Sequence, residues 1–155
     1  MSLSKYYSFG RFKKLFFLAL ANLPMPGHKI RPFFVRLGGV KFVEYSSCFI
    51  GANVHWDTVA PQRITIGKRC AITSGVIILT HYMNTENGRW FQGDVKIGND
   101  VFIGANTIIT KNVTIGNNVV IGAGSIVTKD IPDDEIWAGN PARCIKKRKI
   151  VSNKI

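Results

Sequence analysis

Aliphatic residues recur at every sixth position through the second half of this chain. They are Ile97, Ile103, Ile109, Ile115, Ile121 and Val127. Gly follows most of them, and the fifth residue of each unit, from Val101 to Ile131, is small or β-branched. A six-residue unit is too short for a helical repeat, but it fits one short strand and a corner. The pattern therefore predicts stacked short strands, with Gly and Asn at corners, where a positive φ costs them little.

The same spacing begins earlier in the chain and is interrupted twice. Ile66 and Ile78 keep it, with Ile72 between them, and Ile50 starts a shorter fragment. The step from Ile50 to Ile66 exceeds two units by four residues. The step from Ile78 to Ile97 exceeds one unit by thirteen residues. Each interruption must place extra residues outside the repeating frame.

Three strands of this length would close a triangular coil of eighteen residues. Residues 97–132 then predict two coils, residues 66–83 one coil, and residues 40–65 an irregular one. The thirteen extra residues, at about 82–94, are expected to leave the coil as an external loop. The repeat therefore predicts an all-β scaffold with one large projection.

The first part of the chain has a different period. Apolar residues recur there at helical spacing, at positions Phe12, Leu15, Phe16, Ala19, Leu20 and Leu23. This spacing predicts an amphipathic helix that ends at Pro24 and Pro26. The helix could pack on its own body, on a neighbouring subunit or on anionic lipid. A signal peptide is a rival interpretation, because Arg11–Lys14 precede an apolar stretch.

Charge divides the chain into three parts. The 155 residues fit one domain, with 21 Lys and Arg against 9 Asp and Glu. Residues 1–40 form a basic amphipathic segment, residues 41–147 the repeat domain, and residues 148–155 a basic tail. A net charge of +12 favours acidic partners such as phosphate esters, anionic lipid or nucleic acid. No apolar run reaches the ~18 residues that a membrane-spanning helix needs.

The cysteines do not indicate a structural metal or a disulfide framework. They are odd in number and have no CxxC spacing: Cys48, Cys70 and Cys144. A reducing compartment is the simpler interpretation.

Four stretches carry a resemblance to a known family: Val59–Gly67, Thr80–His81, Val95–Gly104 and Ile121–Pro132. The last is followed by Trp137–Arg143, with the sequence WAGNPAR. Together they resemble the hexapeptide-repeat acyltransferases, especially the sugar and exopolysaccharide O-acetyltransferases such as the galactoside and maltose enzymes. The resemblance implies a left-handed parallel β-helix, a homotrimer with its sites between subunits, and acetyl-CoA as co-substrate. The first 40 residues do not match those enzymes.

His81 is the candidate general base. His28 lies in the basic head and His55 in the first coil, whereas His81 stands where the repeat breaks. A base needs a rigid element with an open side, and histidine exchanges protons near neutral pH. The resemblance implies that His81 matches the family's catalytic histidine, which activates an acceptor hydroxyl for attack on the thioester. No metal is expected, since three scattered histidines do not suit a His₃ zinc site.

The resemblance also implies binding residues. Asn53 and Asp57 match the acceptor side, although Asp57 could equally be a corner cap. Arg89 stands where the galactoside and maltose enzymes carry Glu, which leaves the partner of the histidine open. On the co-substrate side, small side chains would line the pantetheine groove and polar or cationic ones would contact the nucleotide: Ala105, Ala123, Thr128, Lys129, Arg143 and Lys146.

The sequence therefore predicts a cytoplasmic, acetyl-CoA-dependent O-acetyltransferase acting on a sugar or glycan precursor. The basic head would allow peripheral contact with the inner membrane face. One alternative is an acetyltransferase for an antibiotic or serine, which the lack of a long C-terminal helix and of a large helical N-terminal domain disfavours. The other is a non-catalytic β-helix that binds an anionic surface. No nucleic-acid motif is present, so nucleic acid is not an expected partner.

Overall fold

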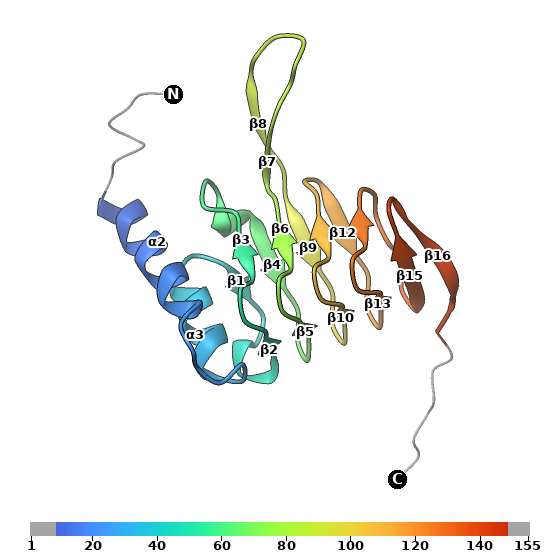
Figure 1. Cartoon of the computed structure of the whole chain (residues 1–155), viewed down its shortest axis with the longest axis horizontal. Helices are drawn as coiled ribbons and strands as arrows, with labels where there is room; N and C mark the ends of the chain where they lie inside the picture. The colour runs from blue at the N-terminus through green and yellow to red at the C-terminus, as the bar shows by residue number, and fades with distance from the viewer. Residues whose placement is uncertain (1–8, 149–155) are drawn as a thin grey trace.

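The computed structural model describes residues 9–148, which form three sheets around one core, a projecting two-stranded hairpin and two helices at one end (Figure 1). The first sheet contains β1 (Lys41–Phe42), β4 (Ile64–Ile66), β9 (Val95–Ile97) and β12 (Val113–Ile115). The second contains β2 (Phe49–Ile50), β5 (Ala71–Ile72), β10 (Phe102–Ile103), β13 (Val120–Ile121), β15 (Glu135–Gly139) and β16 (Ala142–Lys147). The third contains β3 (His55–Trp56), β6 (Ile77–Ile78), β11 (Ile108–Ile109) and β14 (Ile126–Val127). We call residues 41–147 the coil stack.

The chain visits the three sheets in turn, so each circuit adds one parallel strand to each of them. Ile103 pairs with Ile72 on one side and with Ile121 on the other, which places the same position of each unit in register. The first-position aliphatic residues, from Ile50 to Val127, are at most 3% exposed. The predicted stack of aliphatic side chains is therefore confirmed.

The corners use Asn and Gly in two different ways. The fourth residue of the units has a positive φ, as at Asn106 (57°), Asn118 (54°) and Gly124 (69°). That part of the prediction is confirmed. The second-position glycines do not have a positive φ, and for them the prediction is wrong. A Cβ on Gly104 would instead meet the backbone of Ala123 in the next coil, so the close approach of successive coils is what requires glycine there.

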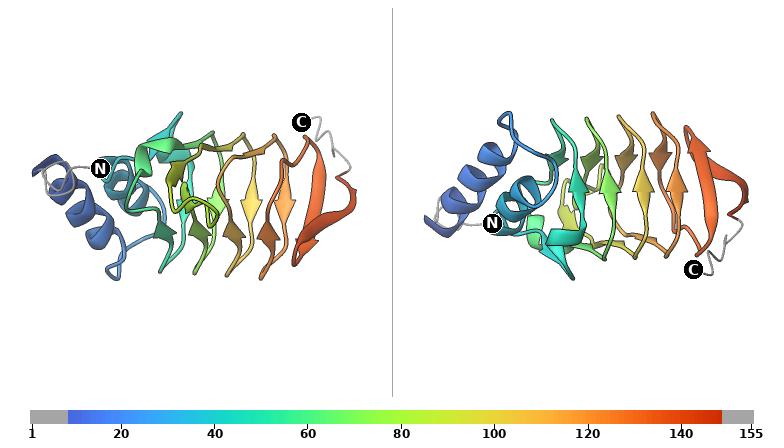
Figure 2. Two further views of the ribbon diagram at one scale, coloured as in Figure 1. Left: turned by 90° about the horizontal axis from the view of Figure 1, so that it is seen from above. Right: turned by 90° about the horizontal axis from the view of Figure 1, so that it is seen from below.

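Two helices, rather than the one expected, cover the first coil. α2 (Phe9–Ala21) packs on α3 (Ile30–Leu37), and α3 packs against β2 and the 3₁₀ turn η1 (Tyr45–Ser47) (Figure 2). We call α2 and α3 the helical cap. None of the helices within residues 9–148 is long and apolar enough to cross a bilayer.

Buried Arg31 connects the helical cap to the coil stack by hydrogen bonds. Its guanidinium donates to the carbonyl oxygens of Ala21 (2.8 Å), Met25 (2.8 Å) and Ile50 (2.9 Å). A buried polar group is tolerated when it is hydrogen-bonded in this way. One side chain thus joins the end of α2, the loop after it and the first coil.

The far end of the coil stack is closed by strand β16, which folds back antiparallel on β15. Trp137 on β15 is only 5% exposed, so it covers the end of the core. The predicted basic tail, residues 148–155, lies outside the described residues except for Arg148. The predicted boundaries of the three parts of the chain stay predictions.

Candidate active site

Both interruptions of the repeat fall at the same corner of neighbouring coils. Strand β3 pairs with β6 so that Trp56 lies opposite Ile78. The first interruption begins directly after Trp56 and includes Asp57 and the 3₁₀ turn η2 (Pro61–Arg63). The second begins after Ile78 and forms an antiparallel hairpin, β7 (His81–Met83) and β8 (Trp90–Gln92). The expected external loop is therefore a projecting hairpin (Figure 1).

This stacking brings His81 against Asp57. The His81 Nδ1 lies 2.6 Å from Asp57 Oδ2, and the side chains are 28% and 0% exposed. An ionised carboxylate only accepts hydrogen bonds, so Nδ1 carries the proton and donates it. The other ring nitrogen, Nε2, is then the basic one. The partner of the histidine, which sequence reasoning left open, is Asp57.

Asp57 is held by the backbone around it. Its Oδ1 accepts hydrogen bonds from the N–H groups of Val59 (2.7 Å) and Ala60 (3.2 Å), and Oδ2 accepts one from Thr80 (2.6 Å). Burial raises the pKa of Asp57, but the hydrogen bonds from Thr80, His81 and Val59 lower it by more, so the net pKa is below its usual range. The carboxylate therefore stays ionised and keeps the imidazole in one orientation.

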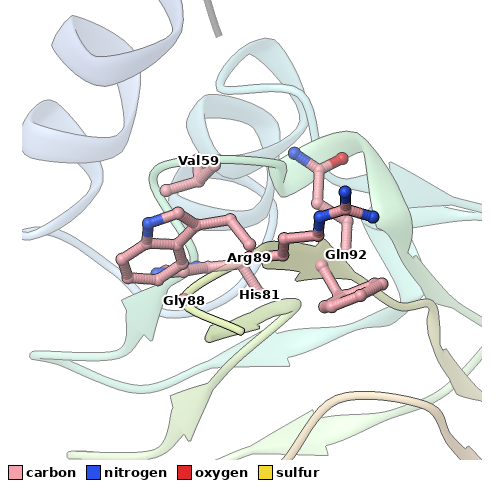
Figure 3. Close-up of a pocket in the computed structure, with 7 residues that line it drawn as sticks. Val59, His81, Gly88, Arg89 and Gln92 are labelled. Carbon is pink, nitrogen blue, oxygen red and sulfur yellow. The ribbon is translucent and has the colours of Figure 1, made fainter. Parts of the chain in front are cut away.

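A cavity of about 760 Å³ opens beside the imidazole. Val59 comes from the first interruption and the remaining lining residues from the second: His81, Gly88, Arg89, Trp90, Phe91 and Gln92 (Figure 3). The Trp90 ring lies 5.5 Å from the His81 ring, between centroids, and the residue is 67% exposed. The pocket therefore combines a base, a cation and open aromatic surface.

Polar contacts fix the base of the hairpin to the first interruption. The Arg63 guanidinium donates to Gln92 Oε1 (3.1 Å) and to Asp94 Oδ1 (2.8 Å). On the other side, Lys111 Nζ lies 4.4 Å from the centre of the Tyr82 ring. The pocket wall is thus held from two neighbouring coils.

Sequence reasoning missed Trp90, Phe91 and Gln92. The sequence offered one signal, the aromatic pair Trp90–Phe91 inside the segment that leaves the repeat. The spacing of residues did not indicate which side chains of this segment turn toward His81. Asn53 lies at an exposed corner with φ 54°, like Asn106, and it does not line the pocket. The structure therefore brings Asp57, but not Asn53, to the histidine.

The residues predicted for the co-substrate lie on the later coils, away from the hairpin. Ala105 and Ala123 follow Ile103 and Ile121, which pair in register, so the two alanines are neighbours on successive coils. Exposed Lys129 has its Nζ 5.3 Å from the centre of the Trp137 ring. Thr128, Arg143 and Lys146 are also exposed at this end of the coil stack. Within residues 9–148, no three His, Cys, Asp or Glu side chains are grouped to hold a metal ion.

Comparisons with known proteins identify the six-residue repeat of this chain. Residues 94–129 match the bacterial transferase hexapeptide (six repeats) family, and residues 47–80 match the hexapeptide repeat of succinyl-transferase. The chain is 40% identical over 154 residues to Protein CapG of Staphylococcus aureus, covering 92% of this chain and 83% of that protein.

Among the solved structures that share the fold are two acetyltransferases. A maltose O-acetyltransferase from Clostridium difficile 630 is 29% identical with a TM-score of 0.64, covering 90% of this chain and 87% of the other. A galactoside acetyltransferase in complex with coenzyme A is 26% identical with a TM-score of 0.63, covering 90% of this chain and 81% of the other.

Proposed function

Because this chain belongs to the hexapeptide-repeat acetyltransferase family, we propose that it transfers an acetyl group from acetyl-CoA to a hydroxyl of a sugar or glycan precursor. The observation that carries the proposal is the pairing of His81 with buried Asp57, at 2.6 Å, beside an open pocket. Sugar acetyltransferases among the similar structures support the acceptor class, and the coenzyme A complex supports the donor.

The proposed reaction is a direct transfer. Nε2 of His81 takes the proton of the acceptor hydroxyl as its oxygen bonds to the thioester carbon of acetyl-CoA. The carbon–sulfur bond then breaks, and the imidazolium gives its proton to the departing thiolate. An acetyl ester and free CoA are the products. Asp57 stabilises the imidazolium between these steps, because its carboxylate is ionised and 2.6 Å away.

The remaining site residues divide between the two substrates. Ala105 and Ala123 would leave room for the pantetheine arm, while Thr128, Lys129, Arg143 and Lys146 would contact the nucleotide phosphates. Asn53 would reach an acceptor only where a bound glycan extends beyond the pocket. Arg89 and Trp90 line the pocket itself and are the closer candidates for contacting the acceptor.

The proposal includes the finer architecture. We infer that the coils wind in a left-handed sense and that three copies assemble, with a neighbour covering the cleft. The exposed aromatic surface of Trp90, at 67%, supports such a cover. We place the reaction in the cytoplasm, where acetyl-CoA is available.

The test is acetyl-CoA turnover with a panel of sugars, measured as release of free thiol. His81→Ala should lower kcat/KM by roughly 10²–10⁴-fold, the usual contribution of a general base, while CoA binding by calorimetry is unchanged. His55→Ala is the matched control, because His55 is exposed and does not line the pocket. Equal turnover by His81→Ala and wild type would refute the assignment of the base. Adding serine and hydroxyl-bearing antibiotics to the panel tests the acceptor class.

A further inference from the structure

Helix α2 carries a stripe of phenylalanine residues on the side that faces away from the molecule. Phe9, Phe12 and Phe16 are 83%, 68% and 51% exposed, and Leu23, two residues beyond the end of the helix, is also 51% exposed. The helical spacing of the three phenylalanine residues places them in one stripe. The inward side is formed instead by Leu18, which is 6% exposed and packs on Gly38, and by Ala21. The apolar face that the sequence predicts, with its partner left open, is thus largely the outer one.

The surroundings of this stripe are cationic. Residues 9–43 contain seven Lys and Arg and no Asp or Glu. Lys13 is exposed and lies one helical step from both Phe9 and Phe16, so it borders the stripe. Lys29 and Arg36 are exposed elsewhere on the helical cap. A stripe of aromatic residues bordered by cations is the pattern of helices that lie in the surface of anionic membranes.

A second copy of the chain is the competing occupant of this face. Contact between two such faces would oppose cations with cations, since the segment has no acid to pair with them. Anionic headgroups supply the missing negative charge, and the acyl region accepts the phenylalanine rings. Charge complementarity therefore favours lipid.

We propose that the outer face of α2 docks on an anionic lipid surface, with the helix axis parallel to the bilayer and the phenylalanine stripe inserted. The docked helix is connected to the pocket by a short series of contacts. Lys14 Nζ donates to Gln62 Oε1 at 3.2 Å, and the next residue, Arg63, donates to Gln92 in the pocket wall at 3.1 Å. Docking would hold the pocket beside the membrane, where a lipid-linked acceptor is within reach. This last step, unlike the docking itself, rests on the proposed function.

The test is flotation of the full chain with vesicles of equal parts phosphatidylcholine and phosphatidylglycerol, compared with phosphatidylcholine alone. We expect binding to the anionic vesicles that weakens at high salt, and little binding to the neutral ones. The double substitution Phe9→Glu/Phe12→Glu should weaken binding at least ~100-fold, about tenfold for each ring no longer buried. Lys13→Gln should weaken it about fivefold.

Ile145→Glu is the matched control. Ile145 is 62% exposed on β16, at the opposite end of the molecule from the helical cap (Figure 1), and its substitution should leave vesicle binding unchanged. Thermal melts of all variants should coincide with the wild type, because the substituted side chains are exposed. Turnover of a water-soluble sugar, followed in parallel, separates failure of the docking from failure of the proposed function.

Two results would overturn the proposal. One is equal binding of anionic vesicles by the wild type and the Phe9→Glu/Phe12→Glu variant. The other is the absence of vesicle binding by the wild type. In that case light scattering measures the size of the oligomer: if the Phe9→Glu/Phe12→Glu variant forms a smaller oligomer than the wild type, the outer face of α2 is an interface between copies of the chain.

Discussion

The residues of the regular half of the coil stack have structural roles, whereas the interrupted half also contains the residues of the candidate site. From Ile97 to Val127 every position follows the six-residue rule, and its side chain fills the core, turns a corner or faces outward. Upstream, two insertions leave the frame at one corner of neighbouring coils and bring Asp57 to His81. The regular coils thus form a rigid support, and the candidate catalytic pair lies where the repeat is interrupted. Substitutions in the regular half should therefore cost stability, and those at the interruptions mainly activity.

The largest effect on stability is expected in the core of the regular half. Ile103 is fully buried, and Ile103→Ala should lower the free energy of unfolding by about 4 kcal/mol, since it leaves a cavity between paired coils. Phe12→Ala, at a residue that is 68% exposed, should change it by less than ~0.5 kcal/mol. Chemical denaturation measures both. A similar cost for the two substitutions would mean that the helical cap is packed as tightly as the coil stack.

A smaller effect is expected from the glycines. Gly104→Ala should lower the free energy of unfolding by about 3 kcal/mol, because the new methyl group meets the backbone of Ala123. Gly10→Ala has open space around it in α2 and should raise stability by up to ~1 kcal/mol through helix propensity. Thermal melts of the two variants should shift in opposite directions. A neutral Gly104→Ala would show that successive coils can separate without cost.

The smallest of the three effects on stability should come from the site itself. Asp57→Asn should cost about 2 kcal/mol at pH 7, because an amide donor then faces backbone N–H groups. Turnover should fall as well, since the imidazole loses its acceptor. Glu86→Gln, at an exposed hairpin position, is the control and should leave both unchanged.

The pH dependence sharpens this prediction. The pKa of Asp57 is lowered on folding, so its stabilisation is complete above the unfolded value of ~3.9 and is lost as pH falls through the folded pKa. The gap between wild type and Asp57→Asn in urea denaturation should therefore shrink toward pH 3. A gap that stays constant with pH would contradict the ionised state of Asp57.

The sequence predicts the coil stack well because burial repeats there with a fixed period. Ile72, Ile103 and Ile121 repeat one environment, so a spacing rule locates them in the core. Glycine is less informative: the sequence predicts a positive φ for Gly104, at a second position, as well as for Gly124, at a fourth position, although only Gly124 adopts one and Gly104 avoids a clash between coils. The reason for glycine at the second position is the short distance between successive coils, which the spacing of residues in the sequence does not give.

The site and the helical cap are predicted less completely because they depend on non-local contacts. Spacing places Asp57 and His81 each at an interruption, but only the register of Trp56 with Ile78 brings the interruptions together. Helix α3 was missed because it is short and holds Arg31 and Pro32 on its buried side. The apolar face of α2 was visible in the sequence, but its direction depends on residues of the opposite side, where Leu18 and Ala21 are buried and Phe17 stacks on Phe34.

The fold-back of β16 has a consequence for solubility. A stack of parallel strands ends in an exposed strand edge, and such an edge can recruit another chain into an end-to-end polymer. In the described part of this chain the last strand of that sheet is β16, which carries Arg143, Lys146 and Lys147. Two molecules meeting at this edge would bring like charges together. The charges on β16, the strand that closes the core, thus also disfavour end-to-end association of molecules at this edge. The helical cap covers the opposite end of the coil stack.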